Sequence, residues 1–172
     1  LVTEVRPDDF AHLRSEWGEL AGLRFQQLFE EAARQHGGGA QIAPAQCVAD
    51  FVAGRPSRSL PMTSYIPGIK PSRLDDWMPH FIAESLRAGL QTFGRRMRGF
   101  VTNEAIVVGV ESRTSTPVRV PRDPATGMHP EVRGLFPAGE GAGYAGGIIS
   151  AALDGERMAD AAADYVEYAT TR

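Results

Sequence analysis

The stretch that decides the fold is residues 134–155, which read Gly-Leu-Phe-Pro-Ala-Gly-Glu-Gly-Ala-Gly-Tyr-Ala-Gly-Gly-Ile-Ile-Ser-Ala-Ala-Leu-Asp-Gly. Its apolar start, residues 135–138, predicts a short strand, and the five glycines in the next nine residues predict a tight turn. Apolar residues then recur at helical spacing, at Ala145, Ile148, Ile149 and Ala152. Glycines let a backbone approach a ligand closely, and a helix N-terminus attracts negative charge. The stretch therefore indicates a site for an anionic ligand.

This stretch contains the dinucleotide-binding sequence motif but lacks the structural context that the motif requires. Gly141-Ala-Gly143-Tyr-Ala-Gly146 matches G-x-G-x-x-G, but that motif needs a second strand after the helix, with an acidic residue about twenty positions on. Residues 158–168 are alanine-rich and helical in pattern instead, so Asp160 and Asp164 fall on the wrong kind of element. A small nucleotide-binding protein that uses these glycines as its own fingerprint is therefore disfavoured.

Composition excludes several classes of function. The chain has 172 residues, 42% of them hydrophobic, which is enough for one core, and its net charge of −3 gives no electrostatic reason to bind nucleic acid or an anionic membrane. No run of 18 apolar residues and no signal-peptide pattern occurs, so the cytoplasm is the expected location. Cys47 is the single cysteine, which excludes a disulfide within the chain, and the four histidines are scattered, so no metal site is expected.

Periodicity predicts the remaining elements. We expect an amphipathic helix over residues 20–36, ended by three glycines, a short helix that starts at Pro44, a loop over residues 54–71, and a helix from Pro79 to Met97. Ser72 and Asp75 look like a capping pair for a short turn. Residues 1–5 could end a strand, residues 105–110 predict a strand buried on both faces, and residues 118–120 predict an edge strand. The expected class is α/β, or α+β for an isolated fragment.

Several segments resemble a family of flavoproteins. The segments are residues 21–26 (Ala-Gly-Leu-Arg-Phe-Gln), 43–46 (Ala-Pro-Ala-Gln), 64–68 (Ser-Tyr-Ile-Pro-Gly), 109–118 (Gly-Val-Glu-Ser-Arg-Thr-Ser-Thr-Pro-Val) and 139–148. Together they resemble bacterial uncharacterised FAD-dependent dehydrogenases of the glutathione-reductase-like two-domain superfamily. In that superfamily, a strand that ends in Gly-Asp or Gly-Glu meets the last helix at the FAD.

The resemblance implies roles for particular residues. It implies that Glu140 holds the ribityl chain of FAD and that the N–H groups of Gly146, Gly147 and Ile148 face the pyrimidine side of the flavin, where the reduced cofactor carries negative charge. The implied cofactor contacts are Gly139, Glu140, Gly141, Gly143, Gly146, Gly147 and Ile148. The catalytic residues stay unknown, with Arg113, Ser115 and Tyr65 as weak candidates. The alternative for Arg113 is a structural salt bridge with Glu111 or Glu140, and the alternative for Glu140 is simple complementation of the helix N-terminus.

The resemblance also implies an organisation. The chain starts at Leu1 and is too short for a complete two-domain flavoenzyme, so we expect a C-terminal fragment. Residues 1–19 would end an upstream element and form a linker, residues 20–100 a mainly helical substrate or cap region, and residues 101–172 the C-terminal segment of the FAD-binding domain. The expected partners are a small-molecule substrate and an N-terminal dinucleotide-binding part of the same chain, with NAD(P)H open as electron donor.

Two hypotheses follow from this reading. In the first, the full-length protein is an FAD-dependent oxidoreductase, a dehydrogenase, and the fragment alone is inactive and binds FAD weakly or not at all. In the second, the chain is a non-catalytic interaction module whose glycine turn serves only helix packing.

Overall fold

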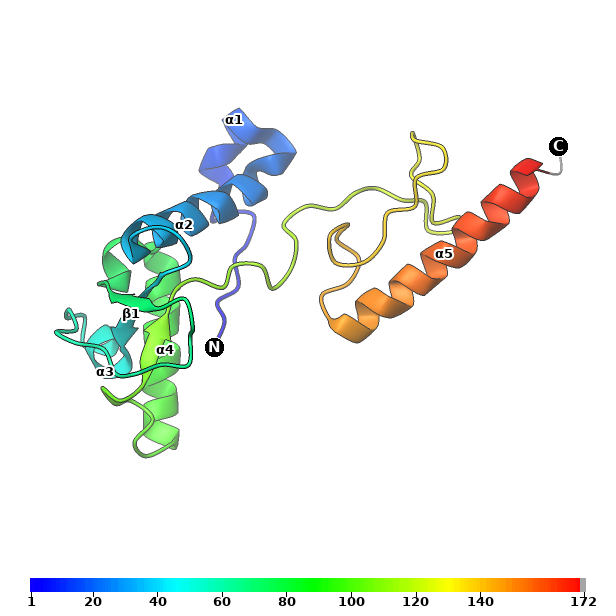
Figure 1. Cartoon of the computed structure of the whole chain (residues 1–172). Coiled ribbons are helices and arrows are strands. Elements are labelled where there is room, and N and C mark those ends of the chain that lie inside the picture. The colour runs from blue at the N-terminus through cyan, green and yellow to red at the C-terminus, as the bar shows by residue number, and fades with distance from the viewer. Residues whose placement is uncertain (171–172) are drawn as a thin grey trace. The chain divides into compact units, whose positions relative to one another are not determined.

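A computed structural model describes residues 1–170 (Figure 1). The chain forms two compact units. Unit 1 contains Leu1–Phe10 and Phe25–Ser112, and unit 2 contains Ala11–Arg24 together with the chain from Arg113 onward.

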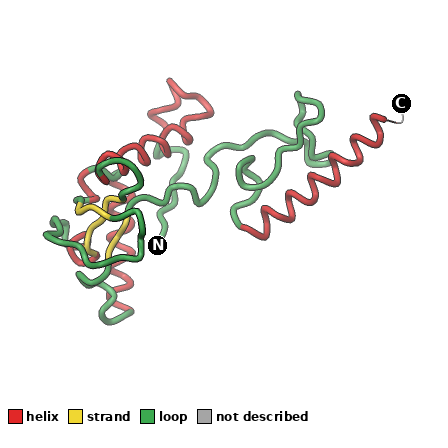
Figure 2. Tube along the Cα trace, viewed as in Figure 1, coloured by secondary structure: helices red, strands yellow, loops and turns green. Residues whose placement is uncertain are grey.

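The sheet of unit 1 has the strand order β2-β1-β3 (yellow in Figure 2). The central strand β1 (Ala43–Cys47) pairs in parallel with β2 (Ile69–Pro71) and antiparallel with β3 (Ile106–Val108). In register, Ala43 lies opposite Ile69, and Ala45 lies opposite Val108. All five residues of β1 are buried, as expected for a strand with neighbours on both edges.

Helices supply most of the core of unit 1. They are α2 (Ala21–Gly37), whose first four residues belong to unit 2, α3 (Val48–Val52), the 3₁₀ turn η3 (Leu74–Asp76) and α4 (His80–Arg96). Their apolar faces and the residues between them form one cluster, which contains Phe29, Val48, Phe51, Leu74, Met78, Ile82, Ala83 and Leu90. Gln46 is fully buried beside this cluster, and its amide donates to the Arg55 carbonyl at 2.8 Å and accepts from the Leu74 N–H at 2.9 Å. The polar side chain is therefore satisfied.

Unit 2 has less regular structure. It contains the short turns η1 (Ala11–Leu13), α1 (Arg14–Trp17) and η2 (Gly18–Leu20) and the long helix α5 (Ile148–Thr170). Residues 113–147 contain turns and extended segments without a helix or strand. They contact α5 through the Arg122 side chain, which bonds to Asp154, and through the Phe136 ring, which packs against Tyr165.

The predicted class and the main helices are confirmed. The structure mixes helices with a small three-stranded sheet, as the α/β or α+β prediction requires. α2, α4 and α5 lie where periodicity placed them, and Gly38 and Gly39 follow α2 with φ of +91° and +94°. The strand over residues 105–110 is confirmed as β3, but it is shorter than predicted and only half-buried because it lies at the edge of the sheet.

Several predicted elements are wrong. The predicted short helix exists as α3, but it starts at Val48 and not at Pro44, which lies in β1. The ladder to β2 passes through Ala43 and Ala45, and the Pro44 carbonyl accepts from the Gly109 N–H at 2.9 Å. The predicted loop contains β2, and residues 1–5 form no strand. Ser72 does not cap η3, because its hydroxyl accepts from Trp77 Nε1 at 3.1 Å.

The two strands predicted in unit 2 are also wrong. Residues 118–120 and 135–138 have no regular secondary structure and no ladder partner among the described residues. The backbone of Val120 bonds to the glycine turn, and the carbonyl of Pro137 accepts from the side chain of Arg122. These groups are satisfied by single contacts instead of by a neighbouring strand.

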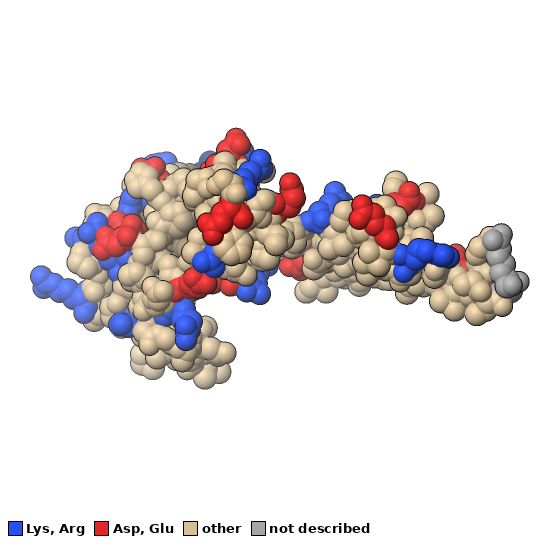
Figure 3. Space-filling model, turned by 90° about the horizontal axis from the view of Figure 1, so that it is seen from above, with Lys and Arg blue, Asp and Glu red and all other residues tan. Residues whose placement is uncertain are grey.

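Basic and acidic side chains are mixed over the face seen in Figure 3. No helix in residues 1–170 is both long and apolar enough to cross a membrane. Within the same residues, no group of three or more His, Cys, Asp or Glu side chains could hold a metal ion.

Candidate functional site

The candidate site is the glycine turn that leads into α5. The turn is closed by its own backbone: Gly143 N–H donates to the Glu140 carbonyl at 2.9 Å, and Tyr144 N–H donates to the Gly139 carbonyl at 3.0 Å. Gly139 and Gly143 have φ of +67° and +85°, a region that favours glycine. The turn is therefore a folded element before any ligand is considered.

A buried ion pair fixes the turn to α5. Asp154, on the second turn of α5, accepts from Arg122 Nη2 at 2.6 Å and from Nη1 at 2.9 Å. The same carboxylate accepts from the Gly139 N–H at 2.8 Å, and Arg122 Nη1 also donates to the Pro137 carbonyl at 2.8 Å. The side chains of Arg122 and Asp154 are only 10% and 9% exposed. A two-pronged, charge-assisted contact of this kind holds its partners in one geometry.

The hydrogen bonds to Asp154 also favour its ionised form. Hydrogen bonds from the Arg122 guanidinium, and then from the Gly139 N–H, lower the pKa of Asp154 to about 2. Burial alone would raise the pKa, so the hydrogen bonds outweigh desolvation. The carboxylate is thus charged at all physiological pH values, and the turn keeps its anchor.

Tyr144 ties the turn to residues 118–122. Its hydroxyl donates to the Val120 carbonyl at 3.0 Å, and the guanidinium carbons of Arg122 and Arg119 lie 3.6 and 4.3 Å from its ring centroid. The Val120 N–H donates to the Ala142 carbonyl at 3.1 Å. At Gly143 the backbones are so close that a Cβ would lie 2.6 Å from the Val118 carbonyl oxygen. Gly143 is therefore required by packing as well as by its φ.

A hollow of about 280 Å³ lies against the turn. One wall consists of Ser115 and Thr116, and the other consists of residues 143–146. All of these residues belong to unit 2. The volume lies just below the range of about 300 to 1,000 Å³ typical of sites for whole small molecules. The hollow thus has the size for one end of a larger ligand.

Two glycines of the turn are not explained by the fold. A Cβ at Gly141 or Gly146 would meet no atom within 4 Å, and neither residue has a positive φ. An alanine could therefore occupy either position without strain in the described chain. Since Gly146 also lines the hollow, its missing side chain leaves room for a ligand to approach the backbone.

The start of α5 is only partly open. The Gly147 N–H donates to Ser150 Oγ at 3.2 Å, and Ser150 Oγ donates to the Gly147 carbonyl at 3.0 Å. The N–H groups of Gly146, Gly147 and Ile148 were expected to point outward, and that of Gly147 has a partner within the chain. Ile148 and Ile149, the first two residues of the helix, are 90% and 73% exposed.

The structure brings together part of the predicted site. Ser115, Gly143 and Gly146 share the hollow, and Gly139, Glu140 and Gly141 form the adjoining turn, with the Glu140 side chain exposed. Arg113 is exposed in unit 2 and does not line the hollow.

Tyr65 lies in the other unit. It belongs to unit 1, where its hydroxyl donates to the Gln41 carbonyl at 2.8 Å. Its polar group thus already has a structural use within that unit.

The residues that position the turn were missed by the sequence analysis. Arg122, Tyr144 and Asp154 carry no recognisable motif. One signal was present for Asp154. It lies on the same helical face as Ala151, Met158, Ala161 and Tyr165, because successive members of this series are three or four residues apart. A carboxylate on such a face is expected to be buried with a cationic partner.

Comparison with known proteins gives two findings. A family model described as "FAD-dependent protein, C-terminal domain-like" matches residues 1–114. An uncharacterised protein of Clostridium beijerinckii is 41% identical to the chain over 162 residues, which are 93% of this chain and 30% of that protein. The chain therefore spans less than a third of the relative that it matches.

Proposed function

Since the chain belongs to the FAD-dependent protein, C-terminal domain-like family, we propose that it is the C-terminal part of an FAD-dependent oxidoreductase of the dehydrogenase type. In this proposal, the glycine turn and the start of α5 contact the flavin end of FAD. An N-terminal part of the same protein supplies the dinucleotide-binding fingerprint. We further propose a relationship to the glutathione-reductase-like two-domain flavoproteins, with NAD(P)H as a candidate electron donor and a small molecule as substrate.

The observation that carries the proposal is the open space beside Gly146. The fold explains Gly143 by a close backbone contact, but it does not explain Gly146, whose missing side chain adjoins the hollow. The hollow is also lined by two hydroxyl-bearing residues, Ser115 and Thr116, and by the turn, and such polar groups suit the polar edge of a flavin ring. These residues therefore fit one end of FAD.

The chain's own residues would bind and orient the cofactor. FAD supplies the redox chemistry, because the flavin itself accepts the electrons of a hydride, so the proposal needs no protein base to explain oxidation. The Arg122–Asp154 ion pair would hold the turn in place, and Tyr144 would fix the turn to residues 118–122. Glu140, exposed at the turn, could accept hydrogen bonds from the ribityl hydroxyls.

One observation favours the alternative of a purely structural turn. Gly143 and Gly139 are explained by φ and packing alone, and a module that never binds FAD would need them equally. The alternative predicts that changes at Gly141 and Gly146 have no effect on the flavin content.

The test compares two glycines in equally open surroundings. Gly146→Ala and Gly155→Ala each add a Cβ that meets no atom within 4 Å, but only Gly146 lines the hollow. We expect Gly146→Ala in the full-length protein to lower FAD affinity about tenfold or more, equivalent to about 1.4 kcal/mol. Gly155→Ala should retain the flavin and raise stability slightly, because alanine favours a helix interior. Flavin per protein, from visible absorbance after gel filtration, and thermal melting are the two readouts.

A second pair of variants tests Glu140. Glu140→Gln should weaken flavin binding, whereas Glu156→Gln, which changes an exposed acid on α5, should not. Equal flavin content in all four variants would support the structural module instead. Bleaching of the flavin on anaerobic mixing with NADH or NADPH would then test the choice of electron donor.

A further inference from the structure

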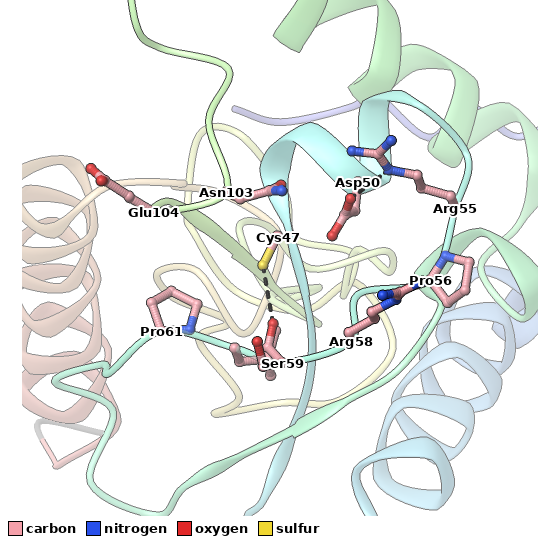
Figure 4. A pocket seen from close by; sticks show the side chains of 10 residues that line it. Cys47, Asp50, Arg55, Pro56, Arg58, Ser59, Pro61, Asn103 and Glu104 are labelled. Carbon is pink, nitrogen blue, oxygen red and sulfur yellow. Dashed lines mark hydrogen bonds and ion pairs between the residues drawn. The ribbon is translucent and has the colours of Figure 1, made fainter.

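A second and larger hollow lies in unit 1, remote in sequence from the glycine turn. It has a volume of about 560 Å³ and lies between the end of β1, the following helix α3, the loop of residues 55–61 and residues 103–104 (Figure 4). We call it the loop pocket. Its volume falls within the range of about 300 to 1,000 Å³ that is typical of small-molecule sites.

The wall of the loop pocket is held in place by hydrogen bonds. Asp50 accepts from Arg55 Nε at 2.7 Å and from Ser57 Oγ at 2.8 Å, and Ser57 Oγ accepts from the Cys47 N–H at 2.9 Å. The Arg55 carbonyl accepts from the buried Gln46, and Cys47 Sγ lies 3.4 Å from the Ser59 carbonyl. Although it has no regular secondary structure, the loop is attached to β1 and α3 at several points. Such a preformed wall loses little conformational entropy when a ligand binds.

Two guanidinium groups line this pocket with donors to spare. Arg55 uses Nε for Asp50, and its two terminal nitrogens donate to no other residue within the part of the chain that the structure describes. Arg58 forms no ion pair or side-chain hydrogen bond with any described residue. The side chain of Arg55 is 62% exposed, so its free nitrogens are accessible. Guanidinium groups match the paired oxygens of carboxylates and phosphates.

The two acidic groups of the pocket leave the charge of Arg58 unpaired. Asp50 is occupied, because its oxygens accept from Arg55 and Ser57, and these hydrogen bonds lower its pKa. Glu104 lies on the opposite side of Cys47 from Arg55 and Arg58 (Figure 4). Since Asp50 pairs with Arg55, the unpaired positive charge on this side of the pocket is that of Arg58, and Arg55 contributes its free terminal N–H donors.

We infer that the loop pocket binds the carboxylate or phosphate group of a small anionic molecule through Arg58 and the terminal nitrogens of Arg55. Neither FAD nor the hollow at the glycine turn is needed for this ligand, because the loop pocket is lined by residues of unit 1 alone. The ligand is a substrate or an effector of the full-length protein.

The experiment measures anion binding by isothermal titration calorimetry. The full-length protein, with any flavin that it retains, is titrated with citrate and separately with inorganic phosphate in a buffer that contains neither. We expect at least one of them to bind with a Kd of about 1 mM or lower. Binding of citrate alone would identify a carboxylate ligand, and binding of phosphate alone would identify a phosphate ligand.

Matched arginine variants decide whether the loop pocket is responsible. Arg58→Gln removes one guanidinium without breaking a contact among the described residues, so it should keep the melting temperature and the flavin content but weaken anion binding about tenfold. Arg98→Gln, at an exposed arginine of unit 1 outside the pocket, should leave the affinity unchanged. The inference is overturned if neither anion binds, or if the two variants weaken binding equally.

Discussion

The interiors of the two units are built from different side chains. Unit 1 buries a large apolar cluster that joins α2, α3 and α4, and its two buried polar side chains, Gln46 and Asp50, lie beside this cluster and are hydrogen-bonded. The part of unit 2 around the glycine turn buries Ala142 and Met158 together with the charged Asp154. Apolar burial is non-directional, whereas an ion pair with three hydrogen bonds fixes directions. Unit 1 thus has the interior of a self-supporting core, and the glycine turn has the interior of a positioned site.

The same comparison applies to the surfaces. α5 exposes Ile148, Ile149, Leu153 and Val166, each by more than half, while its buried face meets the turn through Asp154. In unit 1 the apolar positions of α4 at Ile82 and Leu90 are buried in the cluster. The three predictions below test this contrast, starting with the variant of largest expected effect.

Truncation in the core of unit 1 should cost the most. Phe51 is fully buried, so Phe51→Ala should lower the free energy of unfolding by about 4 kcal/mol through lost burial and a cavity. Phe100→Ala is the control, because Phe100 is 38% exposed and its truncation should cost only about 1–2 kcal/mol. Urea unfolding followed by circular dichroism measures both. Equal losses would mean that the apolar cluster does not dominate the stability of unit 1.

Breaking the ion pair of unit 2 should cost somewhat less. Arg122→Met leaves Asp154 buried with no cation, so the free energy of unfolding should fall by about 3 kcal/mol. The double variant Arg122→Met/Asp154→Leu removes both charges and should recover most of this loss. Arg122→Lys keeps the charge but cannot bond to both carboxylate oxygens and to Pro137, so it should be intermediate. A double variant as unstable as Arg122→Met would contradict a role based on charge pairing.

Acid should remove the contribution of ionised Asp154 to the free energy of unfolding, and this loss should be smaller than that in Arg122→Met. Its pKa of about 2 in the folded chain lies below the ordinary value of 3.8, so the fold favours the carboxylate. The resulting stabilisation, roughly 2 kcal/mol, is present above about pH 4 and is lost as the pH falls toward 2. The difference in unfolding free energy between the wild type and Asp154→Asn should therefore shrink across this window and stay constant above it. A difference that does not change down to about pH 2 would argue against the lowered pKa.

Much of the fold was accessible from local pattern. α2, α4 and α5 were predicted because helical hydrogen bonds and apolar periodicity lie within one segment, and the glycines after α2 gave its end. The glycine turn was predicted because five glycines within nine residues leave few other conformations. For the candidate site, the sequence supplied Ser115, Gly143 and Gly146, which the structure brings to one hollow.

Tertiary structure alone decided the strands and the anchoring of the site. A strand exists only where a second segment pairs with it, and residues 43–47 became β1 because β2 and β3 lie on its two sides. In residues 135–138, by contrast, the Leu135 carbonyl accepts from the His129 N–H and the Pro137 carbonyl accepts from the Arg122 side chain. The Arg122–Asp154 ion pair joins residues 32 positions apart, and the loop pocket joins residues 47–61 to residues 103–104. A local pattern can mark Asp154 as a buried carboxylate, but it does not identify Arg122 as the partner, because the two residues lie far apart along the chain. The helices and the glycine turn could therefore be predicted from the sequence. The polar contacts that position the candidate sites depend on the tertiary structure, because they join distant segments of the chain.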